Sequence, residues 1–253
     1  MIAVSSPGFS MTPVTDMLEA IAPHFRAWEI IAEGMHALPG IKDELEELMH
    51  SHEIELAVHA PFSDLNCASL NAGAKEEAMS QILKSMNIAS DLGIGMFTLH
   101  PGHKSPLGAY FPERSKKAHK ESLRKLDAAG REHGVTLALE NMPKMWISLC
   151  ANSQEMRECI EGTDLMICFD IGHANITGDI EGLLELKDRI RNLHIHDNFG
   201  DVDRHLVVGK GTIDIPGILR ALSGYKGLYV IESMNLPEGI ESKAILERML
   251  EDV

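Results

Sequence analysis

The sequence has few cysteines and no long apolar run, which removes several classes of protein at the outset. Its four cysteines are scattered and none falls in a C-x-x-C pair, which excludes a zinc ribbon and indicates free thiols. The longest apolar runs fall far short of the ~20 residues needed to cross a membrane. Met1 runs directly into apolar residues without a basic segment, so no secretory signal is expected. We therefore expect a cytoplasmic protein with no membrane partner.

Positive charge is also scarce. Lys and Arg total 23 against 38 Asp and Glu, which gives a formal net charge of −15. This balance disfavours a large basic surface for nucleic acid. Divalent cations bound in a cleft would reverse the local field, so a smaller anion-binding region is still compatible with it. Aromatic residues make up only 5% of the chain, which suits an α/β fold better than a β-sandwich.

Short aliphatic runs alternate with amphipathic segments along the whole chain. The runs predict strands at 2–5, 27–31, 54–59, 96–100, 136–140, 165–170, 191–196 and 228–232. The segments between them predict helices at 13–24, 40–52, 74–92, 113–133, 153–161, 180–189, 215–223 and 240–251. Eight strands, each followed by a helix, favour one α/β domain over residues 1–253, a single (β/α)8 TIM barrel. An open doubly wound sheet is the alternative, but no G-x-G-x-x-G turn follows the first strand.

The predicted strands end on residue types that commonly bind metals. These residues are His59, His100, Glu140, Asp170, His194 with His196, and Glu232. In a (β/α)8 barrel the C-terminal strand ends meet on one face, where active sites lie. Side chains alternate along a strand, so Glu140 points away from the side of Leu139 and His194 away from the side of Ile195. We expect the candidate ligands to face the barrel interior.

Two loops add further metal-binding side chains. His173 follows Asp170 by three residues, and Asp203 and His205 lie just beyond the seventh strand. Imidazole mixed with carboxylate favours Zn²⁺, Mn²⁺, Fe²⁺ or Co²⁺ over Mg²⁺ or Ca²⁺. Each residue alone could be an ordinary buried hydrogen-bonding group. A cluster of buried carboxylates without Lys or Arg is costly unless cations are bound, so the set as a whole predicts a metal site.

Short motifs surround these residues in a fixed order along the chain. They are VHAPF, TLHPG, ALENMP, CFDIGH, HIHDN, VDRH with GKGTID, and VIES. Together they resemble the xylose isomerase-like TIM-barrel superfamily, which includes endonuclease IV and many sugar isomerases and epimerases. Each motif alone is weak, whereas the ordered set covers nearly the whole chain from His59 onward.

The resemblance implies an endonuclease IV-like site with up to three divalent ions, of which zinc is the expected type. The first ion would be held by His59 and His100 with Glu140, the second by Glu140, Asp170, His194 and Glu232, and the third by His173, Asp203 and His205. His194 is preferred to His196 because the family pattern is His-x-x-Asp, here His194 to Asp197. His196 would then either support the metal ligands from behind or contact the substrate.

Two reactions are compatible with such a site. The first, and our preferred expectation, is phosphoester hydrolysis, with Glu140 and Glu232 as catalytic carboxylates. Cationic side chains in the motif loops could contact phosphate; they are Lys104, Lys144, Arg204 and Lys210. The alternative is sugar or sugar-phosphate isomerisation or epimerisation with a single ion, in which one of the glutamates transfers the proton. That ion would be held by Glu140, Asp170, His194 and Glu232. A non-enzymatic metal-binding scaffold is a third and weaker reading.

The loops favour a small phosphorylated or sugar substrate over duplex DNA. The loop after the second strand, IIAEGMHALPG, contains no arginine. After HAPF the only side chains that could wedge into a base stack are Phe62 and Leu65, and loop packing accounts for both. Duplex DNA is thus a possible but disfavoured partner.

Overall fold

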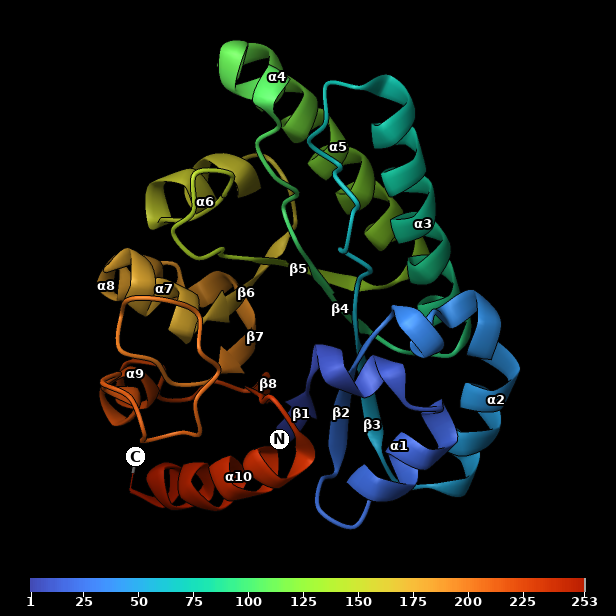
Figure 1. Cartoon of the computed structure of the whole chain (residues 1–253), viewed down its shortest axis with the longest axis vertical. Coiled ribbons are helices and arrows are strands. Elements are labelled where there is room, and N and C mark those ends of the chain that lie inside the picture. The colour runs from blue at the N-terminus through green and yellow to red at the C-terminus, as the bar shows by residue number, and fades with distance from the viewer. Residues whose placement is uncertain (253) are drawn as a thin grey trace.

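A closed barrel of eight parallel strands forms the centre of the computed structural model, which describes residues 1–252 (Figure 1). The strands are β1 Ile2–Ser5, β2 Ala27–Ile31, β3 Glu55–His59, β4 Met96–Leu99, β5 Thr136–Glu140, β6 Met166–Asp170, β7 Ile190–Ile195 and β8 Leu228–Glu232. They pair in chain order and β8 closes on β1, which confirms the predicted (β/α)8 barrel. Val253, the last residue of the predicted domain, lies outside the described residues.

Helices surround the barrel (Figure 1). They are α1 Val14–Ile21, α2 Leu38–Ser51, α3 Ala72–Asp91, α4 Pro106–Tyr110, α5 Pro112–His133, α6 Ser153–Ile160, α7 Ile171–Thr177, α8 Ile180–Leu184, α9 Ile215–Ala221 and α10 Leu236–Glu251, with 3₁₀ turns η1 Pro7–Met11, η2 Gly34–His36 and η3 Lys187–Arg189. Asparagine side chains cap α3, α6 and α10, each accepting a backbone N–H of the first turn. Within residues 1–252 no helix combines the length and apolar character needed to cross a membrane.

The structure differs from the sequence prediction at three short elements. The loop expected after Asp170 is the helix α7, because the Asp170 carboxylate accepts the backbone N–H of His173 at 2.6 Å and so caps the first turn. The helix α4 begins in the same way at Ser105, whose hydroxyl accepts the N–H of Gly108. The helix predicted at 180–189 ends at Leu184 and continues as the turn η3.

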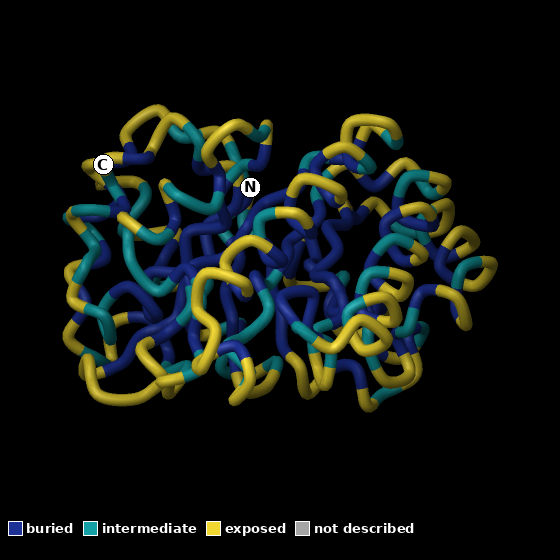
Figure 2. The backbone as a smooth tube through the Cα atoms, turned by 90° about the horizontal axis from the view of Figure 1, so that it is seen from above, coloured by how far each residue is buried: buried dark blue, intermediate teal, exposed yellow. Residues whose placement is uncertain are grey.

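The core has two parts separated by the strands. Large apolar side chains such as Phe97, Leu139 and Phe169 fill the layer between the strands and the helices. Inside the barrel, the end opposite the C-terminal ends of the strands is closed by a small cluster of Ala3, Ala27, Ala57, Leu228 and Val230. Figure 2 shows that the buried residues lie at the centre of the molecule and that the exposed residues lie on the outer helices and loops.

The floor of the barrel is expected to be intolerant of added volume. Ala57 is fully buried among the small side chains of this floor. Ala57→Leu should lower the free energy of unfolding by about 1–3 kcal/mol, because a packed interior accepts extra methylene groups only with strain. Urea unfolding followed by circular dichroism measures the change. Ala74→Leu, at an exposed position of α3, is the matched control and should change stability by less than about 0.5 kcal/mol; equal effects of both variants would contradict the assignment of a close-packed floor.

Candidate metal centre

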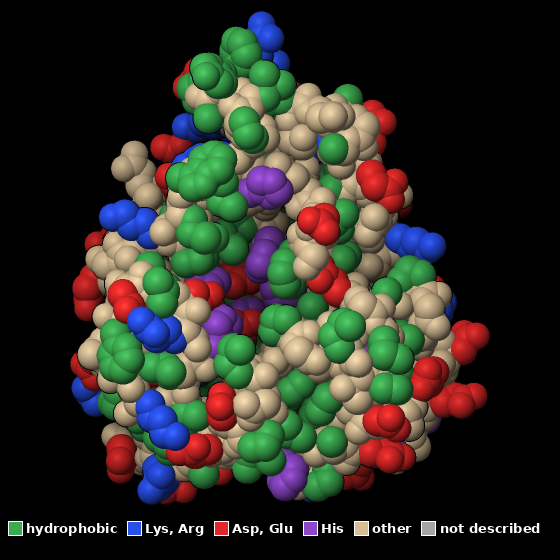
Figure 3. Space-filling model, viewed as in Figure 1, with side chains coloured by type: hydrophobic (Ala, Val, Ile, Leu, Met, Phe, Trp, Pro, Cys, Tyr) green, Lys and Arg blue, Asp and Glu red, His purple; other side chains and the backbone are tan. Residues whose placement is uncertain are grey.

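Histidine and carboxylate side chains gather in a hollow at the C-terminal ends of the strands (Figure 3). The strand ends of β3, β5, β6, β7 and β8 each contribute a side chain, and the loops after β4 and β7 and the helix α7 contribute the rest. All nine metal ligands predicted from the sequence meet there: His59, His100, Glu140, Asp170, His173, His194, Asp203, His205 and Glu232.

Glu140 lies at the centre of the cluster and faces two groups of histidines. Its Oε2 lies 3.2 Å from Nε2 of His59 and 3.1 Å from Nε2 of His100. Its Oε1 lies 3.4 Å from Nδ1 of His173 and 3.7 Å from Nδ1 of His194. Burial would raise the pKa of the Glu140 carboxyl, but attraction to His100 and His194 outweighs burial and holds this pKa well below its usual value. Glu140 is therefore a carboxylate whose two oxygens can serve two different ions.

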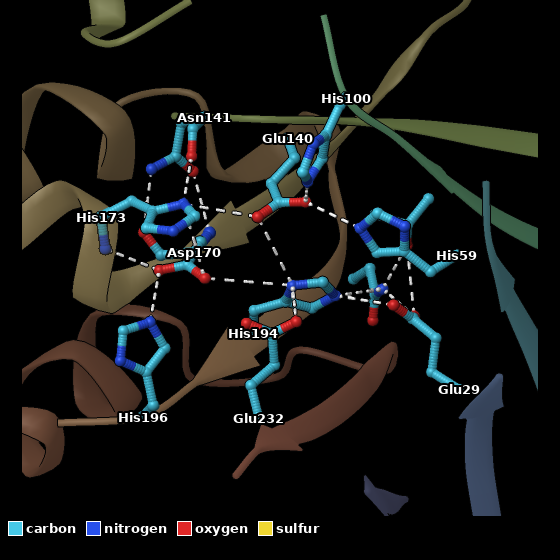
Figure 4. Close-up of polar contacts among 12 residues, drawn as sticks. Glu29, His59, His100, Glu140, Asn141, Asp170, His173, His194, His196 and Glu232 are labelled. Atoms are coloured by element: carbon cyan, nitrogen blue, oxygen red, sulfur yellow. Dashed lines mark hydrogen bonds and ion pairs between the residues drawn. The ribbon is translucent and has the colours of Figure 1, made fainter. Parts of the chain in front are cut away.

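The second group converges on one ring nitrogen. Nδ1 of His194 lies 3.2 Å from Oε1 of Glu232, 3.7 Å from Oε1 of Glu140 and 3.9 Å from Oδ2 of Asp170 (Figure 4). Among the described residues, neither Nδ1 of His194 nor Oδ2 of Asp170 has a hydrogen-bond partner, although both atoms are buried. Unpaired buried polar atoms are costly, and a cation between them would satisfy both. These side chains fit a divalent ion.

The third group is centred on Asp203. Its Oδ2 lies 3.1 Å from Nε2 of His173 and 3.2 Å from Nε2 of His205. Burial disfavours the charged forms, but the neighbouring charges outweigh it. His173 and His205 hold the pKa of Asp203 far below its usual value, Asp170 and Asp203 raise the pKa of His173 to about 10, and Asp203 and Glu232 raise the pKa of His205 to about 9. His205 adopts a φ of 46°, in the left-handed region that non-glycine residues seldom occupy.

The loop that carries Asp203 and His205 is fastened by Asp197. The Asp197 carboxylate accepts the backbone N–H groups of Asn198, Gly209 and Ile213 at 2.9–3.2 Å. Asp197 was not among the predicted site residues, and its role is to close this loop rather than to bind an ion.

His196 is more deeply placed than the sequence suggested. The sequence offered it as a support for the ligands or as a substrate contact, and its side chain is fully buried, with Nε2 lying 3.3 Å from Oδ1 of Asp170 and 3.4 Å from Oδ1 of Asp203. Its ring stacks on that of His205 with centroids 4.0 Å apart. The ring also fills the space where a side chain of Gly172 would lie, since a Cβ there would be 2.0 Å from Cε1 of His196.

Sequence reasoning missed the residues that support the ligands from below. Glu29, fully buried on β2, has Oε1 at 2.9 Å from Nε2 of His194 and accepts hydrogen bonds from Asn192 and Thr98 through Oε2. A carboxylate behind a histidine fixes the ring so that its other nitrogen faces the ion. A charged residue within the otherwise apolar AWEII strand, on the interior side, was the available signal.

Asn141 supports the opposite side of the site. Its amide donates to the carbonyl of Asp170 and accepts the Asp170 backbone N–H, and its own carbonyl lies 2.8 Å from Nδ1 of His173. These bonds tie the end of β5 to the end of β6.

The four cationic residues predicted to contact phosphate lie outside the cluster. Lys210 pairs with Glu241 at 2.7 Å, and Arg204 bonds Asp201 and lies over the ring of Phe199. Lys144 is exposed, and Lys104 lines a separate cavity. A role in phosphate binding stays a prediction for all four.

The rim beside the histidines is largely apolar. The ring of Phe62 packs against His59 and His100, with centroids 5.1 and 4.4 Å away. Phe62 and His100 line a cavity of about 150 Å³ together with Met145, whose neighbour Trp146 is 71% exposed. The rim therefore offers apolar contact rather than positive charge.

Comparison with known proteins places the chain among related barrels. The family model described as xylose isomerase-like TIM barrel matches residues 18–249. The uncharacterized protein MJ1311 of Methanocaldococcus jannaschii is 35% identical over 99% of this chain and 89% of its own length. A probable endonuclease 4 of Mesomycoplasma hyopneumoniae strain J is 24% identical over 66% of this chain and 64% of that protein. The crystal structure of a D-tagatose 3-epimerase-like protein is 34% identical, with a TM-score of 0.93, and the match covers 100% of this chain and 98% of that one.

Glu29 is expected to control metal affinity without touching the ion. Glu29→Gln keeps the shape of the side chain but removes the charge behind His194, so affinity for Zn²⁺ should fall about 10–100-fold. Competition with a chromophoric chelator measures this affinity. The matched control is Glu55→Gln, an exposed glutamate on β3, which should leave the affinity unchanged. Wild-type affinity in Glu29→Gln would show that the contact has no positioning role.

Metal binding should release protons and strengthen as the pH rises. In the metal-free protein the pKa values of His173 and His205 are about 10 and about 9, so both rings carry a proton at pH 7 that an ion must displace. Apparent affinity should therefore increase from pH 7 towards pH 9. Calorimetric titration with Zn²⁺ in buffers of different ionisation enthalpy counts the released protons; identical heats in every buffer would contradict the proton displacement.

Proposed function

Because the chain belongs to the xylose isomerase-like TIM barrel family, we propose that it is a divalent-metal-dependent enzyme that hydrolyses phosphoester bonds in small substrates. The observation that supports this most strongly is the charge of the site. Five carboxylates lie in or directly behind the cluster, namely Glu29, Glu140, Asp170, Asp203 and Glu232. Within residues 1–252 their ion-pair partners are histidines only.

Charge counting favours more than one ion at this site. With neutral histidines, a single divalent ion would leave the five carboxylates with a net charge of about −3, and protons on His173 and His205 would reduce this to about −1, whereas three ions would give about +1. A site of net positive charge suits an anionic phosphoester, and a strongly negative site would repel it. Several sets of three donors lie close enough together for an ion each, among them His59, His100 and Glu140, and Glu140 is shared between two of these sets.

The residues of the chain divide the work between holding and orienting. The nine predicted ligands, His59 and His100 among them, would bind up to three ions. Zinc is the type of ion that best fits imidazole and carboxylate ligands together. Bound ions would supply an activated water and neutralise charge on the phosphate oxygens. Glu140 holds two groups in register through its two oxygens, and Glu29 orients His194.

A specific observation favours a second candidate, sugar epimerisation or isomerisation at a single ion. Glu140, Asp170 and Glu232 all approach the same nitrogen of His194. Together with His194 they form the four-ligand set expected for a single ion. The likeness to a D-tagatose 3-epimerase-like protein supports the same reading. Glu140 or Glu232 would then move the proton on the carbon next to the substrate carbonyl.

The rim argues for a small substrate in either case. Its exposed side chains include Met145 and Trp146, and the cationic residues nearby are exposed or paired with acids. Tight binding of duplex DNA depends on many cationic contacts to phosphate. The chain, with a net charge of −15, offers few such contacts. We therefore expect weak binding of duplex DNA.

His205→Ala separates the two reactions. His205 belongs only to the third group of donors, so its loss should remove one ion and leave the group around His194 in place. If the protein hydrolyses phosphoesters, the rate should fall about 100-fold or more, which corresponds to about 2.7 kcal/mol. If it epimerises sugars, the rate should change little.

The assay measures metal content and turnover together on protein prepared without chelator. The panel contains small phosphomonoesters and phosphodiesters, ketoses and their phosphates, and abasic and intact duplex DNA. His50→Ala, on the exposed face of α2, is the matched control and should retain both the metal and the rate. The first proposal would be overturned if the protein hydrolysed no phosphoester and epimerised a ketose. If abasic DNA were the best substrate of the panel, the expectation of a small substrate would be wrong.

A further inference from the structure

A second cluster of metal-binding side chains lies away from the barrel mouth, between α5 and α6. One ring nitrogen of His119 and the sulfur atoms of Cys150 and Cys159 lie within 4.8 Å of one another. His119 is on α5, Cys159 is on α6, and Cys150 lies near the end of the loop that leads from β5 to α6. These residues belong to none of the three groups at the mouth.

One buried atom of this cluster lacks the partner that buried polar groups normally have. His119 is 3% exposed, and among the described residues its Nε2 has no hydrogen-bond partner. Cys150 is 1% exposed, and its Sγ lies 2.7 Å from Sγ of Cys159, although both cysteines are free. Cys150 also has a φ of 54°, an unusual conformation for a residue with a side chain. A ligand that binds all three side chains would give Nε2 of His119 a partner.

We propose that His119, Cys150 and Cys159 form a binding site for one soft divalent cation, of which Zn²⁺ is the best fit. Two thiolates and an imidazole are typical zinc ligands, and a tetrahedral ion with three protein donors keeps one position for water or another donor. That position can be reached from a cavity of about 350 Å³, which is lined by Cys150, Cys159 and His119 together with Lys104 and Leu149.

A disulfide between Cys150 and Cys159 explains less of the structure. It would join the two sulfur atoms, but it would leave Nε2 of His119 buried without a partner. A metal ion uses all three side chains.

The ion would fasten the loop that borders the mouth. This loop spans 141–152 and starts next to Glu140. The backbone N–H of Met142 donates to the carbonyl of Cys150, so the fixed end of the loop is bonded directly to its beginning. The side chains of Met145 and Trp146 project from the segment between these points. An ion held by α5 and α6 would therefore set the position of the apolar rim.

The test uses Co²⁺, whose charge-transfer absorption in the near ultraviolet appears only when a thiolate is bound. The full-length protein, reduced with a phosphine, is titrated with Co²⁺, and the reaction of its native thiols with an alkylating reagent is followed with and without Zn²⁺. The wild-type protein should show the absorption and should lose the alkylation of Cys159 when Zn²⁺ is present. Cys159→Ser and His119→Ala should lose the absorption.

Cys168→Ser is the matched control, because Cys168 lies beside Glu140 and His194 at the mouth and could bind cobalt there. It should keep the absorption. Loss of the absorption in Cys168→Ser but not in Cys159→Ser would overturn the proposal, as would absence of the absorption in the wild-type protein at excess Co²⁺. Two fewer titratable thiols in protein isolated without reductant, with no bound metal, would identify the pair as a disulfide and also overturn it. The alkylation measurement needs no variant and so stands even if a variant fails to fold.

Discussion

Five carboxylates lie at one end of the barrel, and the four that are buried, Glu29, Glu140, Asp170 and Glu232, set the conditions for the rest of the mouth. An unpaired buried carboxylate is costly, and the charge opposite each one must come from bound cations or from protons on histidine. Among the described residues, the carboxylates pair with histidines and with no lysine or arginine. Protons and metal ions consequently compete for the same side chains, and the electrostatic state of the site is set by which of them is bound.

The interior of the barrel is arranged in layers that build towards this site. Small apolar side chains such as Ala57 and Val230 close the floor. Glu29, Thr98 and Asn192 form a hydrogen-bonded layer above it, and the metal-binding side chains follow at the strand ends. Each layer rests on the strands rather than on loops, and side chains on such elements are held more precisely. The ligands that come from loops, Asp203 and His205, are held instead by the bonds that Asp197 makes to the backbone.

Much of this could be predicted from the sequence because the alternation of a strand carries positional information. The interior side of Glu140 and His194 followed from their apolar neighbours, and the barrel then brought distant strand ends together. Glu29 escaped notice because its strand reads as ordinary core, and its partner His194 is 165 residues away. The acid partners of Lys210 and Arg204 were not predicted for a different reason. A flexible cationic side chain pairs with an acid that lies near it, and these acids are Glu241 and Asp201.

The close approach of Gly172 to His196 has a consequence for how this site can change over generations. A side chain at position 172 would occupy the volume of the imidazole, so it cannot be acquired while His196 is in place. Replacing His196 first would leave two acids, Asp170 and Asp203, without the ring between them. Neither order of substitution is without cost, so the two positions behave as a single inherited unit. Divergence of the site is thereby directed towards its rim and loops, where single substitutions carry no such obstacle.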